Sequence, residues 1–145
     1  MKLSNSVKLS FSTLGCPGWT LAQIAENGAR YGYDGVELRI SGHQHVDPSL
    51  CPEERKAIRE LFAQQGLAIV ALSGYTEFTG DNAEALAQNG EALVQNILLA
   101  RDLGAAYVRT FHGEDYGVTL QSRKGGGTLI EIKIGFSPGF YFGEL

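Results

Sequence analysis

Hydrophobic and polar positions along this chain follow two different periods. Strands are predicted where apolar residues alternate or form a short bounded run, and helices where apolar residues recur at three and four positions. The strand patterns lie at 8–14, in the turn and strand of 33–39, at 67–72 and at 106–111. The three segments between them carry the helical pattern, so strands and helices are expected to alternate.

The ends of the three predicted helices carry recognisable signals. Thr20 to Gln23 has the form of a capping box, in which each side chain bonds the backbone amide of the other residue. Pro52 suits a first helical position because its missing N–H would have no partner there. The segment 81–84 begins the third helix with an acidic cap. Glycines, which adopt the left-handed conformation at low cost, end the helices at Gly32, Gly66 and Gly104.

Alternating strands and helices joined by short turns indicate parallel βαβ units with right-handed crossovers. An open doubly wound sheet and a (β/α)8 barrel both contain such units. A dinucleotide-binding open sheet carries G-x-G-x-x-G after its first strand, and the glycine turn at 15–18 does not match it. The barrel is therefore the favoured architecture.

Four motifs together resemble one family. They are FSTLGCP (Phe11–Pro17), YGYDGVELR (Tyr31–Arg39), GLAIVALS (Gly66–Ser73) and ARDLGAAYVRTFHG (Ala100–Gly113). Their order and spacing are similar to those of the sugar phosphate isomerase/epimerase family, which has a xylose isomerase-like TIM barrel and is related to endonuclease IV. Because a full barrel takes about 250 residues, the resemblance implies a partial (β/α)8 TIM barrel of about four strand–helix units, the N-terminal half, over residues 1–118.

The resemblance ends after Val118, where an atypical tail rich in glycine and aromatic residues, 119–145, replaces the expected helix. Within it, TLIEIKI at 128–134 alternates cleanly and predicts one amphipathic strand. The tail is either a native strand that caps the half-barrel or a non-native end produced by a frameshift or truncation. The loss of the pattern within a repeat favours the second interpretation.

Composition limits the class of binding partner and the cellular compartment that we expect for this chain. A formal charge of −4 over 145 residues disfavours nucleic acid, because duplex binding needs a concentrated basic face. Cys16 and Cys51 lack metal-ribbon spacing and suit reduced thiols. The N-terminus has no apolar signal core and no run approaches the roughly 18 apolar residues of a membrane span. We therefore expect a cytoplasmic protein that binds a small molecule and neither nucleic acid nor membrane.

Barrels of this kind place the active site at the C-terminal ends of their strands. The residues at those positions are Cys16, Trp19, Glu37, Arg39, His43, His45, Ser73 to Glu77, Arg109, His112, Glu114 and Asp115. Glu37 and Arg39 are two apart and share a strand face, opposite Val36 and Leu38. They are expected to point into the barrel, either as a structural ion pair or as pocket lining in which Arg39 contacts a sugar hydroxyl or phosphate oxygen.

The remaining candidates each have a plainer interpretation. His43 and His45 could ligate zinc or manganese, and the alternatives are a solvated loop or substrate contact. His112 is a substrate-binding candidate or a plain loop residue, and Trp19 stacks on a sugar ring or packs on the first helix. Cys16 has no identifiable His–Asn partner and is not expected to be a nucleophile.

The resemblance implies an isomerase or epimerase that acts on a sugar or sugar phosphate with a divalent metal, Mn, Zn, Mg or Co. In the family the ligands, typically Glu, Asp, His and Glu, come from strands of the second half. The catalytic residues therefore stay unassigned, and the chain alone is expected to bind little or no metal and to be weakly active or inactive. The alternatives are a non-catalytic half-barrel acting by self-association, as a homodimer through exposed sheet edges, and a metal-dependent hydrolase using the loop of His43 and His45.

Overall fold

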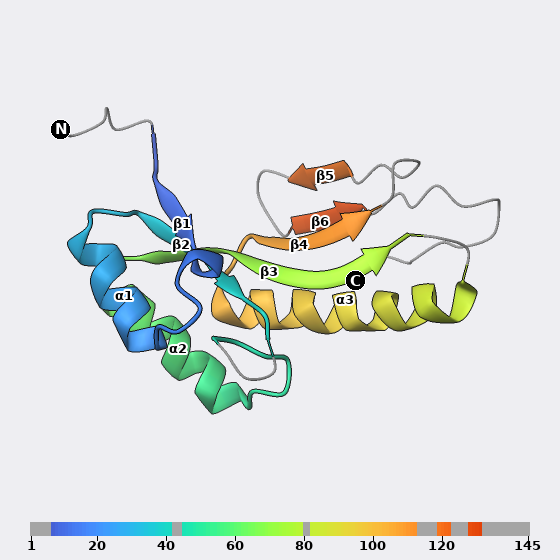
Figure 1. Ribbon diagram of the computed structural model, residues 1–145, viewed down its shortest axis with the longest axis horizontal. Coiled ribbons are helices and arrows are strands. Elements are labelled where there is room, and N and C mark those ends of the chain that lie inside the picture. Colours follow the sequence, from blue (N-terminus) through green and yellow to red (C-terminus); the bar gives the residue numbers. More distant parts are fainter. Residues whose placement is uncertain (1–6, 42–44, 80–81, 113–118, 123–127, 132–145) are drawn as a thin grey trace.

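The computed structural model describes residues 7–41, 45–79, 82–112, 119–122 and 128–131. Four strands form one parallel sheet in the order β1-β2-β3-β4, and three helices connect them (Figure 1). The elements are β1 (Ser10–Ser12), the short 3-10 helix η1 (Thr13–Gly15), α1 (Leu21–Arg30), β2 (Gly35–Arg39), α2 (Pro52–Gln64), β3 (Ala68–Phe78), α3 (Ala83–Leu103), β4 (Tyr107–His112), β5 (Thr119–Ser122) and β6 (Thr128–Glu131).

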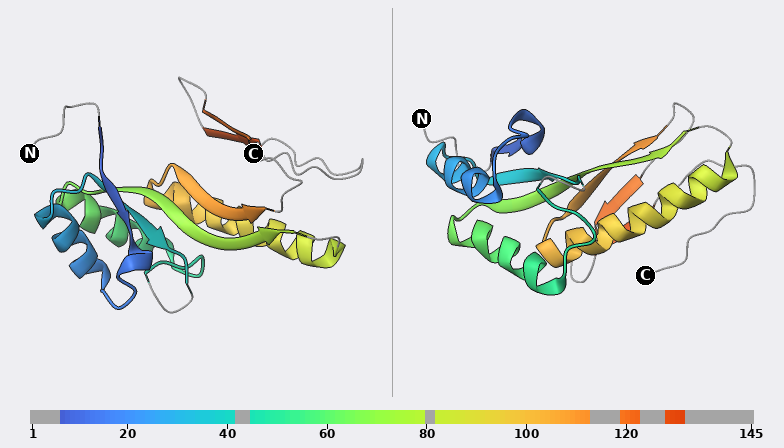
Figure 2. Two further views of the ribbon diagram at one scale, coloured as in Figure 1. Left: turned by 45° about the horizontal axis from the view of Figure 1, so that its top comes forward. Right: turned by 60° about the horizontal axis from the view of Figure 1, so that its bottom comes forward.

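The strand order decides between the two architectures considered above. When each strand lies beside its predecessor and every crossover has the same hand, all helices fall on one face of the sheet. Helices α1, α2 and α3 do lie together on one side of the sheet (Figures 1 and 2). A doubly wound sheet would reverse its order and carry helices on both faces. The α/β partial TIM barrel is thus confirmed, and the face without helices is its concave, inner face.

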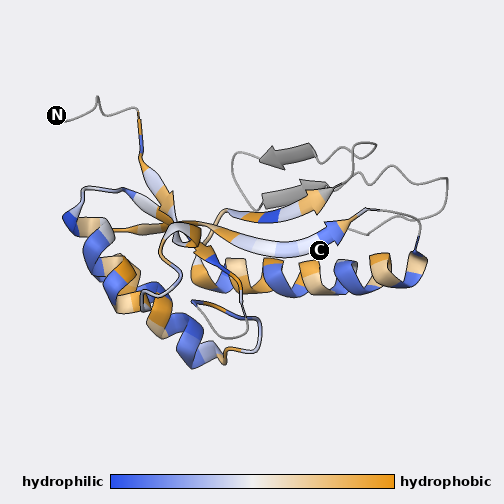
Figure 3. Ribbon diagram, viewed as in Figure 1, coloured by the Kyte–Doolittle hydropathy of each residue, from blue (hydrophilic) through white to orange (hydrophobic). Residues whose placement is uncertain are grey.

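The hydrophobic core lies between the sheet and the helices. Val36 and Leu38 of β2 and Leu72 of β3 are fully buried, and they pack with Phe62 of α2 and Leu99 of α3. Hydropathy changes along β3, from hydrophobic near its start to hydrophilic towards its end (Figure 3). The start of β3 therefore belongs to the core, whereas its later residues contribute polar side chains to the inner face.

The predicted helix boundaries follow from local chemistry. Thr20 and Gln23 form the expected capping box, with the Gln23 amide donating to the Thr20 hydroxyl at 3.2 Å and the Thr20 amide donating to the Gln23 side chain at 2.9 Å. The prediction of an acidic cap for the third helix is wrong. The cap of α3 is the neutral side chain of Asn82, which accepts hydrogen bonds from two backbone amides. Left-handed glycines follow the helices at Gly32, Gly66 and Gly104.

Two predicted strand lengths are wrong. β1 is shorter than 8–14, because the Ser12 hydroxyl accepts from the Leu14 amide at 3.3 Å and begins the turn η1. β3 is longer than the predicted strand at 67–72, because it continues to Phe78. Within this extension Gly74 lies against the backbone of β4, where there is no room for a side chain.

The described part of the tail forms a separate pair of strands. β5 and β6 pair antiparallel, and β6 covers the first half of the predicted strand at 128–134, whose end lies outside the described residues. In the four-stranded sheet as described, β1 and β4 each have a single neighbour. The domain boundary at residue 118 and the edge-to-edge homodimer stay predictions. Across the described ranges no helix is long and apolar enough to cross a membrane.

Gly74 provides a test of the contact between β3 and β4. A Cβ added there would meet the Arg109 carbonyl oxygen at 2.7 Å and the Asn96 amide at 3.1 Å. Gly74→Ala is expected to lower the free energy of unfolding by about 1–3 kcal/mol, the usual cost of overpacking, in urea denaturation followed by circular dichroism. Gly18→Ala is the matched control, since a Cβ at Gly18 meets nothing within 4 Å. Equal stability of the two variants would contradict the described packing.

Candidate active site

The inner face of β2 carries the two charges predicted for it. Glu37 and Arg39 are half-buried, opposite the buried Val36 and Leu38. The Ser73 hydroxyl donates a hydrogen bond to the Glu37 carboxylate, and Ser73 is itself fully buried. The predicted face of both residues is confirmed, whereas their ion pair and their role in substrate binding stay predictions.

The buried Thr13 holds the end of β2 in place. Its hydroxyl accepts a hydrogen bond from the Arg39 backbone amide at 2.9 Å. Thr13 belongs to the turn that follows β1, so this bond joins the C-terminal ends of two strands. Sequence reasoning missed this anchor, because a threonine at the end of an alternating segment gives no sign of its partner.

Aromatic and guanidinium groups gather beside this position. The guanidinium carbon of Arg39 lies 5.6 Å from the ring centroid of Tyr75, and that of Arg109 lies 5.3 Å from the same centroid. Arg109 also lies 4.9 Å from the ring centroid of Phe111. Both rings are exposed, so the group is open to solvent in the described residues.

His45 follows β2 and has an unusual environment. Its backbone is left-handed, with φ of 66°, which is costly for a residue with a Cβ. Burial lowers the pKa of its imidazole, the nearby charge of Arg39 lowers it further, and the backbone of Trp19 acts in the opposite direction. The imidazole is therefore predominantly neutral at pH 7, the form in which histidine donates a lone pair to a metal.

The described residues do not assemble the metal site considered for this loop. His43 lies outside them, as do Glu114 and Asp115. Within the described ranges, no three His, Cys, Asp or Glu side chains are grouped so that they could hold a metal ion. The arrangement seen here does not fit a metal, and we derive no chemical step through one.

The other candidates lie around the same end of the sheet or in its core. Trp19 and Cys16 are partly buried and pack against the hydrophobic core, and burial raises the pKa of the Cys16 thiol. A raised pKa favours the unreactive thiol over the thiolate. His112 is the last residue of β4, with its backbone in register with Phe78. Substrate contact by Trp19 or His112 stays a prediction.

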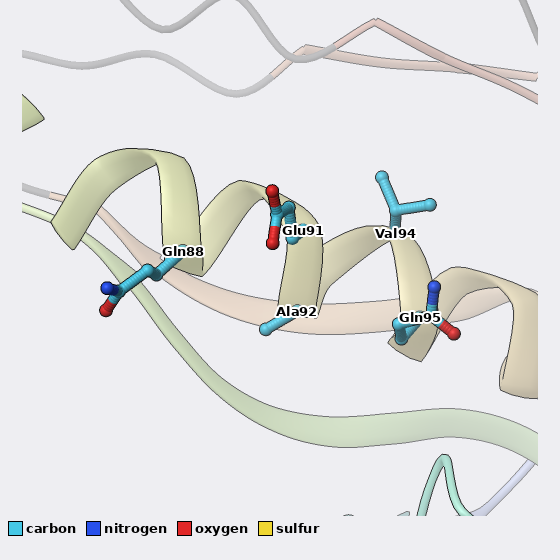
Figure 4. A pocket seen from close by; sticks show the side chains of 5 residues that line it. All are labelled: Gln88, Glu91, Ala92, Val94 and Gln95. Atoms are coloured by element: carbon cyan, nitrogen blue, oxygen red, sulfur yellow. The ribbon is translucent and has the colours of Figure 1, made fainter. Parts of the chain in front are cut away.

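A shallow depression also occurs on the surface of α3. Its lining residues are Gln88, Glu91, Ala92, Val94 and Gln95 (Figure 4). All five come from one helix and no second element faces them, so the depression is the side of a helix and not a cleft. The inner face of the sheet is the better candidate site.

Sequential parallel strands with their helices on one face define part of a β/α barrel. The model of one family, the xylose isomerase-like TIM barrel, matches residues 25–128. The chain therefore belongs to this family. No curated protein sequence matches the chain.

Solved structures support the same fold. A xylose isomerase-like TIM barrel/4-hydroxyphenylpyruvate dioxygenase fusion protein is 24% identical, with a TM-score of 0.57 over 72% of this chain and 16% of its own. The probable 3-DHS dehydratase AsbF of Bacillus anthracis is 17% identical, with a TM-score of 0.51 over 75% of this chain and 39% of its own. A D-psicose 3-epimerase is 14% identical, with a TM-score of 0.56 over 72% of this chain and 37% of its own. The chain thus spans well under half the length of each.

The environment of His45 predicts a pH dependence of stability. The pKa of His45 is lower in the folded than in the unfolded protein. The neutral imidazole therefore makes its full contribution to the free energy of unfolding above the usual pKa of about 6.5. This contribution is lost as the pH falls through the folded pKa. His45→Asn, which tolerates the left-handed backbone, is expected to flatten the decline in unfolding free energy between about pH 7.5 and 5. Urea denaturation across this range measures the difference.

Asp34→Asn is the control for this experiment. The Asp34 carboxylate accepts from the Leu9 amide at 2.9 Å, and this bond, with the charge of Lys8, lowers its pKa. Its contribution is lost only as the pH falls below about 4, so this variant should retain the slope between pH 7.5 and 5. A His45→Asn protein with the wild-type slope would contradict the assigned environment.

Proposed function

We propose that this chain forms one wall of the substrate pocket of a sugar or sugar-phosphate isomerase or epimerase. The observation that carries the proposal is the group of polar side chains on the inner face of β2 and β3, Glu37, Arg39 and Ser73, in a chain that belongs to the xylose isomerase-like family. A D-psicose 3-epimerase shares the fold, and its structure was determined in the presence of D-fructose. A ketose is therefore the substrate class that we propose.

Glu37 and Arg39 have complementary roles in this proposal. The Ser73 hydroxyl holds one carboxylate oxygen of Glu37, which leaves the other able to accept from a sugar hydroxyl. The Thr13 hydroxyl fixes the backbone of Arg39, whose planar fork donates to a hydroxyl or phosphate oxygen. Trp19 and His112 are proposed as further substrate contacts.

Proton transfer is the step that we leave to residues outside the described part. In such an enzyme a divalent metal would polarise adjacent substrate oxygens and carboxylates would move the proton, and the described residues provide no group of ligands for that metal. The described residues of this chain bind and orient the sugar in this scheme. The 145-residue chain alone is accordingly expected to show weak or no turnover.

The proposal is tested by ketose binding to the 145-residue chain. Binding of D-fructose, followed by NMR chemical shifts, is expected to weaken about tenfold in Glu37→Gln, since a hydrogen bond to a charged group contributes about 1.5 kcal/mol. Glu26→Gln is the matched control, because Glu26 is an exposed residue of α1. Equal binding by the two variants, or no binding by the wild type, would overturn the role of Glu37.

A turnover assay tests separately whether the chain binds the sugar without containing the groups that transfer the proton. The chain is supplied with Mn²⁺, Co²⁺, Mg²⁺ or Zn²⁺ and assayed for epimerisation of ketoses and ketose phosphates. A rate within the ordinary enzyme range of about 1–10³ s⁻¹ would show that the chain contains the whole catalytic machinery, contrary to the proposal.

A further inference from the structure

Three residues stand in one row across the middle of the inner face. Arg39 of β2 is in register with Ser73 of β3, and Ser73 is in register with Arg109 of β4. Neighbouring strands lie about 4.8 Å apart, so the two arginines flank the central strand at the same height. The strand pairing itself, and not a loop, sets their separation.

Tyr75 orients both guanidinium groups. It is two residues beyond Ser73 on β3, and both guanidinium carbons lie within stacking distance of its ring, at 5.6 Å and 5.3 Å. Stacking uses the flat faces of a guanidinium and leaves its N–H edge available for hydrogen bonds. The rings of Tyr75 and Phe111 thus hold Arg109 in place without consuming its donors.

Arg109 has donor capacity left over. Its Nη2 donates a long hydrogen bond of 3.4 Å to the Gly74 carbonyl oxygen, and its buried Nε has no hydrogen-bond partner among the described residues. Ion pairs within the described ranges join Lys8 to Asp34, Arg55 to Asp102, Lys56 to Glu60 and Arg101 to Asp102, and none includes Arg109. A half-buried cation with a vacant donor favours an anionic ligand.

The acidic groups nearby do not cancel this charge. Glu37 is the one carboxylate on the same face of β2, and it accepts from Ser73. Glu77, further along β3, accepts from the Thr79 hydroxyl at 2.7 Å. Neither is paired with Arg109 in the described residues.

We propose that Arg109, together with Arg39, forms an oxyanion-binding site, and that the substrate of this pocket is an acidic sugar derivative that carries a phosphate or a carboxylate. Two forks that flank β3 from the strands on either side of it suit the bidentate geometry of both anions. The assignment of the anion to a sugar rests on the proposed function, whereas the anion site itself rests on the geometry of the row. Arg109 is thereby a specificity-determining residue that selects charged over neutral sugars.

The test is binding of inorganic phosphate and of glycolate to the 145-residue chain by isothermal titration calorimetry, at an ionic strength held constant with chloride. Arg109→Gln is expected to weaken binding of the preferred anion at least tenfold, and Arg109→Lys less, because lysine keeps the charge without the fork. Arg59→Gln, on the exposed surface of α2, removes the same charge and is expected to bind like the wild type. Tighter binding of phosphate than of glycolate identifies a phosphorylated substrate, and the reverse order identifies a sugar acid.

Equal losses of anion affinity in Arg109→Gln and Arg59→Gln would overturn the proposed site, since anion binding would then depend on the overall charge of the protein. Absence of binding of both anions by the wild type would overturn it as well. The circular dichroism spectrum and urea midpoint of each variant verify that it is folded. Arg39→Gln provides a second test from β2, on the other side of β3. Sugar binding tests the proposed function separately. Anion binding that is lost in Arg109→Gln, with no binding of ketoses or ketose phosphates by the wild type, supports the anion site and rejects the proposed function.

Discussion

The structure depends on the alternation of side chains along parallel strands that are covered on one face only. In β2, Val36 and Leu38 are fully buried against the helices, and this burial obliges Glu37 and Arg39 to face the other way. A shift of one residue in register would bury both charges in the core and expose both apolar side chains. The hydrophobic contact between sheet and helices therefore determines the orientation of every polar group at the candidate site.

Local signals in the sequence predicted most of the fold. The Thr20 capping box, Pro52 and the glycines after each helix act within a few residues, so they can be identified without knowledge of the tertiary structure. Two errors concern local contacts, the Ser12 hydroxyl that ends β1 and the Asn82 cap of α3, and the third concerns a distant contact. β3 continues to Phe78, beyond its predicted end at residue 72, and within this extension Gly74 lies against the backbone of β4 and the side chain of Asn96.

The features of the candidate site also fall into those that the sequence predicted and those that it did not. Alternation along one strand was sufficient to place Glu37 and Arg39 on the inner face. The stacking of Arg39 and Arg109 on Tyr75 depends on the register of three strands, and neither the sequence separation nor the residue types reveal that register. The hydroxyl of Thr13 was missed for the same reason, because its partner is a backbone amide on another strand.

The one-sided placement of the helices also has an evolutionary consequence. Residues that stabilise the fold and polar residues of the inner face alternate along β2, so selection can act on Arg39 while leaving Leu38 unchanged. Single substitutions on the inner face of β2 can therefore accumulate with little loss of foldability. Ser73 of β3 differs, since it is fully buried although it bonds Glu37 on the inner face. Substitution there would change the packing of β3 and the position of the Glu37 carboxylate together, which makes Ser73 a strongly constrained position.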